Sequence, residues 1–211
     1  MPPPNGCEDG FYPGTDTVIF TVLYTYAQVM SIIGDYQNLT WSSSPAGSVT
    51  LNGTDNTVGT ARTYDIAGAH VFKTITTYSK PPNGPYEEIH TLALLTIPSA
   101  NVSFYGDYDG TTVTPVCNDA ASTFNFTRNF CASNATLAGT ILHMLHLTDA
   151  QTVGVFLGGQ NFSSCAALSN STAASTSTPP MVTANSATTY MASISTLMFV
   201  VGGLLAWLGL I

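Results

Sequence analysis

The pattern of hydrophobic and polar positions near the start of the chain predicts a strand followed by a helix. The run TVIFTVLYT, residues 17–25, is rich in β-branched and aromatic residues, as strands are. In the following TYAQVMSIIGDY, Thr25 and Gln28 have the spacing of a capping box, and Gly34 provides a stop. We therefore expect a strand that leads directly into a short helix over residues 26–33.

Six further strand-type runs fill the middle of the chain, separated by turn residues such as those in PPNGP and Asp109-Gly110. They are SVTLNG (48–53), GTARTYDIAG (59–68), HVFKTITTYSK (70–80), YEEIHTLALLTI (86–97), NVSFYGDYDGTTVTPV (101–116) and ASTFNFTRNF (121–130). Because the connections are short, they favour an antiparallel meander.

The stretch 134–162 is typical of a long helix. Its apolar positions recur at helical spacing, at Leu137, Ile141, Met144 and Leu145. Thr148 and Gln151 repeat the capping-box spacing, so we expect the helix to break near Leu147, to restart, and to end at Gly158. The pattern predicts an α+β domain, and the alternative, a β-sandwich, would leave this closing helix unexplained.

The C-terminal end has the organisation of a glycosylphosphatidylinositol (GPI) anchor signal. The last fifteen residues, 197–211, carry no charge and no proline, but a spanning helix needs roughly 20 residues. A polar spacer, Thr188 to Thr196, follows the small residues Asn185, Ser186 and Ala187 and precedes this tail, which is the order of an anchor signal. The alternatives are a membrane-spanning tail anchor and a core helix, and the Ser/Thr/Pro-rich stretch before the tail disfavours the latter.

We therefore divide the chain into an N-terminal segment 1–14, a folded domain 15–167, a stalk 168–187 and a removed signal 188–211, with Asn185 as the attachment point. The opening MPPPNGCEDG has neither the basic nor the apolar region of a signal peptide. Because a GPI anchor requires the secretory pathway, we expect a leader that this sequence lacks. The expected location is the extracellular face of the plasma membrane or the cell wall.

Charge and composition agree with a glycosylated surface. Four basic residues against twelve acidic ones give a net charge of −8, which disfavours nucleic acid as a partner. Only 8% of residues are charged, against about a quarter in soluble domains. Seven Asn-X-Ser/Thr sequons offer another source of solubility, at Asn38, Asn52, Asn101, Asn125, Asn134, Asn161 and Asn170.

The four cysteines predict two disulfides in an oxidising compartment. Three pairings are possible, and we favour Cys117 with Cys131, which are close in sequence, and Cys7 with Cys165, which would join the ends of the domain. No Cys-X-X-Cys spacing supports zinc or thiol redox chemistry.

The element order resembles the helix-grip fold of the START-like superfamily, which includes Bet v 1-like and polyketide cyclase/lipid transport proteins. YAQVMSIIGDYQNLTWSS (26–43) is similar to its first helix running into an Asp and a Trp, and VGTARTYDIAGAHVFKTITTYS (58–79) to its Gly-X-X-Arg strand, turn and next strand. The resemblance covers residues 17–160 and implies a curved antiparallel sheet of about seven strands around a long C-terminal helix. Where many members carry an acid after the turn, this chain has Lys73 and Thr74, so no role that rests on that acid is expected.

The resemblance also implies an apolar cup between sheet and helix that holds a lipid, sterol or phenolic. A glycan on Asn125 must face solvent, so alternation along this strand turns Phe124, Phe126, Arg128 and Phe130 inward. In the run 59–68, Arg62 shares a face with the apolar residues Tyr64 and Ile66. A guanidinium in such a cup needs a carboxylate partner or an anionic ligand group. The candidate ligand-binding residues are Arg62, Tyr64, Tyr78, Phe104, Phe126 and Arg128.

We expect no catalytic residue, metal or cofactor. His143, His146 and Asp149 have metal-ligand spacing on a helix, but the expected restart would turn Asp149 away. Glu87 and Glu88 are adjacent on a strand and point to opposite faces, so they cannot form a carboxylate pair.

The sequence thus predicts a monomeric, GPI-anchored, N-glycosylated surface protein that binds a small apolar or amphipathic ligand and is not an enzyme. One alternative is a structural or adhesive wall glycoprotein without a ligand. Another is a cyclase- or hydrolase-like enzyme that uses His90 or His143 as acid or base.

Overall fold

The computed structural model describes residues 6–172, which belong almost entirely to one compact unit, Met1–Asn170. Most of the expected stalk, the hydrophobic tail and the expected attachment point Asn185 lie outside the described residues. Within the described part, no helix is both long enough and apolar enough to cross a membrane.

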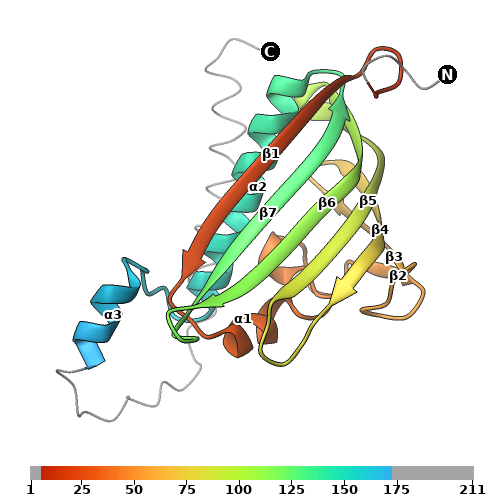
Figure 1. Cartoon of the computed structure of the whole chain (residues 1–211). Coiled ribbons are helices and arrows are strands. Elements are labelled where there is room, and N and C mark those ends of the chain that lie inside the picture. The colour runs from red at the N-terminus through yellow and green to blue at the C-terminus, as the bar shows by residue number, and fades with distance from the viewer. Residues whose placement is uncertain (1–5, 173–211) are drawn as a thin grey trace. The chain divides into compact units, whose positions relative to one another are not determined.

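Seven strands form one antiparallel sheet in the order β1-β7-β6-β5-β4-β3-β2 (Figure 1). The strands are β1 (Tyr12–Val22), β2 (Thr50–Asn52), β3 (Ala61–Ile66), β4 (Ala69–Ser79), β5 (Tyr86–Ile97), β6 (Val102–Val116) and β7 (Ala121–Ala132). Strands β2 to β7 follow one another as a meander, as the short turns predict, and β1 pairs with β7 at the far edge.

The first helix, α1 (Tyr26–Ile33), has the predicted bounds. Its capping box is present: the Thr25 hydroxyl accepts a hydrogen bond from the Gln28 N–H at 3.2 Å, and the Gln28 side chain accepts one from the Thr25 N–H at 2.9 Å. These two bonds satisfy N–H groups that would otherwise lack partners at the helix start.

The long helix α2 (Ala135–Phe156) runs without interruption, so the predicted break near Leu147 is wrong. A capping-box spacing does not stop a helix whose buried face continues, and here buried positions recur on both sides of the expected break. They include Ala138, Leu142, His146, Ala150 and Val153. A short helix, α3 (Cys165–Thr172), extends into the first residues assigned to the stalk.

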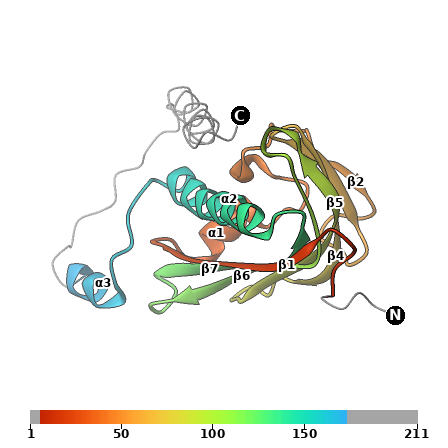
Figure 2. The ribbon, with the colours of Figure 1, turned by 90° about the horizontal axis from the view of Figure 1, so that it is seen from above.

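The sheet curves around α2, which packs on its concave face, most extensively along β1 (Figure 2). The predicted alternation holds along β7, where Phe124, Phe126, Arg128 and Phe130 are all buried. The predicted helix-grip architecture is therefore confirmed, and the β-sandwich alternative is wrong because a helix, not a second sheet, covers this face.

Two disulfides form, but the predicted pairing is wrong. Cys7 is bonded to Cys131 and Cys117 to Cys165, with Cα–Cα distances of 5.6 and 5.1 Å. Cys117 precedes the start of β7 and Cys131 lies near its end, and this strand, at 3.3 Å per residue, is about 40 Å long. Because β1 pairs with β7, the segment before β1 instead lies beside Cys131.

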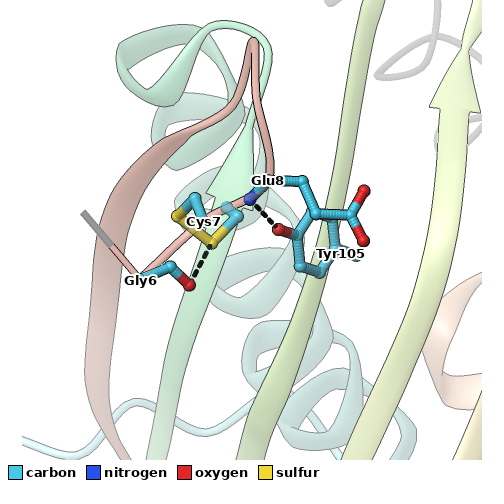
Figure 3. The surroundings of a disulfide bond; sticks show 5 residues. Gly6, Cys7, Glu8 and Tyr105 are labelled. Atoms are coloured by element: carbon cyan, nitrogen blue, oxygen red, sulfur yellow. Dashed lines mark hydrogen bonds between the residues drawn. A yellow bond between two sulfur atoms is a disulfide. The ribbon is translucent and has the colours of Figure 1, made fainter. Parts of the chain in front are cut away.

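The N-terminal segment is also held against β6. The Tyr105 hydroxyl accepts a hydrogen bond from the Glu8 N–H at 2.8 Å, next to the disulfide of Cys7 (Figure 3). Phe11 packs edge to face on the Tyr105 ring, with 5.3 Å between the ring centroids. The segment 1–14 thus contributes ordered contacts to the domain from Gly6 onward.

Candidate functional site

A small cavity lies between the concave face of the sheet, the turn Thr40–Ser42 and α2. Its volume is about 40 Å³, which is space for about three water molecules. Half-buried Ile66 of β3 and Leu145 of α2 are among the apolar side chains that line it. A steroid ring system does not fit into this space.

The lining is charged, so the expectation of an apolar cup is wrong. Eight acidic, basic or histidine side chains line the cavity: Arg62, Lys73, Glu88, His90, Asp109, Arg128, His146 and Asp149. All of them are at most 9% exposed. Charged groups are rarely buried unless they are paired, so each one calls for a partner.

Four of the six candidate ligand-binding residues line the cavity, namely Arg62, Tyr64, Phe126 and Arg128. The other two lie elsewhere in the core. Phe104 is 3% exposed near the start of β6, and Tyr78 packs edge to face on Tyr86, with 5.9 Å between the ring centroids.

Asp109 of β6 joins two of the buried cations. Its Oδ2 lies 2.5 Å from Lys73 Nζ and 2.6 Å from Arg128 Nη2. Burial alone would raise the pKa of Asp109, but the charges of Arg128 and Lys73 outweigh it and hold that pKa well below its usual range. The carboxylate is therefore ionised at any physiological pH.

Glu88 of β5 is the second buried carboxylate. Its Oε1 lies 2.8 Å from His90 Nε2, and its Oε2 accepts a hydrogen bond from the Tyr86 hydroxyl at 2.8 Å. Burial opposes ionisation, but His90 and Arg62 overcome it and lower the pKa of Glu88 to about 2. Its neighbour Glu87 is half-buried on the other face, as the strand pattern predicts.

Arg62 of β3 has no ion pair with any described carboxylate. It is 5% exposed, and its Nη1 donates a hydrogen bond to the Tyr36 carbonyl oxygen at 3.0 Å. The guanidinium carbon lies 4.0 Å from the centre of the Tyr36 ring, a cation–π distance. Burial opposes the charge, but Glu88 and other neighbours outweigh it and raise the pKa of Arg62.

The Nε–H of Arg62 is buried and has no acceptor among the described residues. Asp65, which lies on the same strand, is at the surface, 2.8 Å from His70. Arg62 is therefore a permanent buried cation that lines the cavity and has one N–H donor without an acceptor among the described residues.

Helix α2 contributes His146 and Asp149, and the expectation that Asp149 turns away is wrong because the helix does not restart. Asp149 Oδ2 accepts a hydrogen bond from the Ser42 hydroxyl at 3.0 Å, and burial raises the pKa of Asp149 to about 7. His146 Nδ1 lies 3.3 Å from Asp16, which also binds His143 Nδ1 at 2.9 Å. No cluster suited to a metal ion occurs within residues 6–172.

Of the eight charged or histidine side chains that line the cavity, the candidate ligand-binding residues included only Arg62 and Arg128. Side chains alternate between the two faces of a strand, and this alternation places Lys73 of β4 and Glu88 and His90 of β5 on the inner face. It could therefore have identified these three residues from the sequence. Asp109 follows a register irregularity between Tyr105 and Tyr108, so alternation along β6 alone would not have shown that its side chain faces inward.

The sequons lie at accessible positions. Asn52, Asn101, Asn134 and Asn161 are exposed, while Asn38 and Asn125 are half-buried. The side chain of Asn170 is outside the described residues.

No family model and no curated protein sequence matches the chain. Among solved structures, the chain is similar to the protein XoxI from Bacillus cereus, with a TM-score of 0.53 and 13% identity over 68% of this chain and 95% of that one. A protein from Nitrosospira multiformis aligns with a TM-score of 0.51 and 15% identity over 67% and 94%. Ara h 8.0201 aligns with a TM-score of 0.49 and 14% identity over 70% and 99%. At such low identities the first two likenesses establish the fold alone, which is the helix-grip fold.

Proposed function

We propose that this chain is a GPI-anchored, N-glycosylated surface protein whose helix-grip domain binds a small amphipathic ligand by its anionic end. The observation that carries the proposal is Arg62. A buried guanidinium that lines a cavity and has no carboxylate partner among the described residues is a suitable receptor for the carboxylate of a ligand.

The cavity concentrates positive charge. Three of the four basic residues in the chain line it, and only Lys80 does not. Glu88 and Asp109 supply two negative charges, and Asp149 is close to half-protonated at neutral pH. The lining therefore carries a positive excess that favours an anionic group.

The size of the cavity limits what enters it. About 40 Å³ accommodates the anionic group and a few carbon atoms. An apolar remainder would lie along Ile66 and Leu145, which are only half-buried. The ligand class is thus a short or medium-chain carboxylate rather than an enclosed sterol, and a purely structural wall protein would gain nothing from an unpaired buried cation.

Binding is tested by isothermal titration calorimetry of the purified full-length protein with linear carboxylates from acetate to decanoate. We expect Arg62→Gln to weaken binding by about 10- to 100-fold, the effect of losing a charge-assisted hydrogen bond. The matched control is Lys80→Gln, at the one basic residue outside the cavity, which should leave binding unchanged. Equal affinity in the Arg62→Gln protein, or no binding of any carboxylate, would refute the proposal.

Surface anchoring needs its own test. The accessible sequons and the C-terminal pattern around Asn185 support it. Phosphatidylinositol-specific phospholipase C should release the protein from intact cells that express it behind a signal peptide. Retention after this treatment, with the hydrophobic tail still present by mass spectrometry, would argue for a tail anchor instead.

A further inference from the structure

The wall of the cavity formed by α2 carries a base and an acid next to each other. His146 and Asp149 are three residues apart on an uninterrupted helix, so their Cβ atoms are about 5–6 Å apart on one face. Both line the cavity, and the two residues are 4% and 5% exposed. Neither takes part in the anion-binding role assigned to Arg62.

His146 is held in the orientation of a general base. Its Nδ1 faces Asp16 Oδ2 at 3.3 Å, which places the ring hydrogen on Nδ1 and leaves the lone pair on Nε2. The ring stacks on Phe126, with 5.1 Å between the centroids, so it cannot turn freely. Burial lowers the pKa of His146 against the opposing effect of Asp16, so the imidazole is neutral at pH 7.

Asp149 is held in the state of a general acid. Burial raises its pKa to about 7, and the Ser42 hydroxyl donates to Oδ2, so the proton of the neutral acid lies on Oδ1. Neighbouring groups whose pKa values are pushed in opposite directions are a general mark of acid–base assignments. Here a carboxyl keeps its proton up to about pH 7, while the pKa of an imidazole one turn away is lowered.

We propose that the cavity catalyses proton transfer on a small oxo acid, with His146 as base, Asp149 as acid and Arg62 as the receptor for the substrate carboxylate. This reaction rests on the proposed binding of an anionic group. An oxo acid of three or four carbons matches the volume of the cavity, and its ketone supplies both an acidic C–H and an oxygen that can accept a proton.

The step is enolisation. His146 Nε2 takes a proton from the carbon beside the ketone, and the C–H electron pair becomes the new C=C bond. The C=O electron pair moves to oxygen, which takes the proton from Asp149 Oδ1. The products are the enol, an imidazolium and a carboxylate, and the reverse transfers restore the ketone, so no oxidant or reductant is consumed.

The test uses the purified full-length protein with pyruvate in D₂O. Proton NMR follows the loss of the methyl signal as deuterium replaces hydrogen, and calorimetry measures binding in parallel. His146→Gln and Asp149→Asn should each slow the catalysed exchange by about 100-fold or more. His70→Gln makes the same change at an exposed histidine and should have no effect.

The pH profile separates catalysis from a structural role. Other charged or titratable groups around His146 are Asp16 of β1, Lys73 of β4, Asp109 of β6, Arg128 of β7, and His143 and Asp149 of α2. Exchange requires neutral His146 and protonated Asp149, so the rate should be bell-shaped and fall above pH about 7. Asp16→Asn should move the acidic limb to lower pH, because Asp16 raises the pKa of His146.

Two outcomes overturn the reaction: pyruvate binds but does not exchange above the buffer rate, or exchange survives His146→Gln. If pyruvate does not bind while longer carboxylates do, the reaction is refuted and the binding function stands. If no carboxylate binds, the binding function itself fails.

Discussion

Replacing Asp109 by Asn tests whether one carboxylate neutralises two buried cations. The side chain of Asp109 is 5% exposed, and its Oδ2 lies 2.5 Å from Lys73 and 2.6 Å from Arg128. Asn keeps the shape but leaves both cations without a counter-charge. Removing one partner of a buried ion pair costs about 3–5 kcal/mol, and because two cations are affected we expect about 5 kcal/mol. For a domain of this size that corresponds to a fall in Tm of roughly 10–20 °C.

The assay is urea unfolding at pH 7 with the disulfides intact, followed by far-ultraviolet circular dichroism. The matched control is Asp65→Asn, which breaks a pair with His70 whose side chains are 79% and 70% exposed. That change should alter the free energy of unfolding by no more than about 0.5 kcal/mol. A loss below about 1 kcal/mol in the Asp109→Asn protein would show that the cations are solvated or paired otherwise, contrary to this reasoning.

The same comparison has a defined pH dependence. The folded-state pKa of Asp109 lies well below the ordinary value of 3.8, so its contribution to stability is complete above that value. It is lost as the pH falls through the folded-state pKa. The difference in stability between wild type and Asp109→Asn should therefore be constant near neutrality and shrink in acid below pH 3.8. A difference that grows in acid would contradict the assignment.

Three further results are expected. Peptic digestion without reduction should yield peptides joined through Cys7–Cys131 and Cys117–Cys165, and replacing Cys7 and Cys131 by Ser should lower the free energy of unfolding by about 2–5 kcal/mol. The folded-state pKa of Asp149 is about 7 against 3.8 unfolded, so the wild-type protein should become less stable relative to Asp149→Asn as the pH rises from 3.8 to 7. The expected loss in free energy of unfolding is on the order of 4 kcal/mol, which urea titrations would measure. Finally, enzymatic deglycosylation of protein from a eukaryotic secretory host should lower its mass by more than one N-glycan, and an unchanged mass would refute the glycosylated surface.

Much of the fold could be predicted because local patterns determine it. The capping box at Thr25 and Gln28 sets the start of α1, and turn residues set the meander. The start of β1 was missed because Pro13 and Gly14 are poor strand formers. An edge strand tolerates Pro. Glycine is required at position 14 because the Phe130 ring fills the space that a side chain there would need.

The site was harder to predict because register between strands assembles it. Alternation turned Arg62 and Arg128 inward, but it could not say which carboxylate meets which cation. Arg128 lies opposite Asp109 in the β6–β7 ladder, and Arg62 lies opposite Lys73 in the β3–β4 ladder. Neither alignment can be deduced from a single strand, and the disulfides were mispaired for the same reason.

The burial of the cations also determines how susceptible the domain is to cleavage by trypsin-like proteases. Trypsin-like enzymes cleave after Lys or Arg, and the chain has only Arg62, Lys73, Lys80 and Arg128. Three of these are at most 9% exposed inside the sheet, and the exposed Lys80 precedes Pro81, a bond that such enzymes do not cut. The folded domain thus offers them no cleavable bond, whereas the unfolded chain offers three. Tryptic digestion therefore reports on the unfolded population, and a protein built this way resists such proteases for as long as it stays folded.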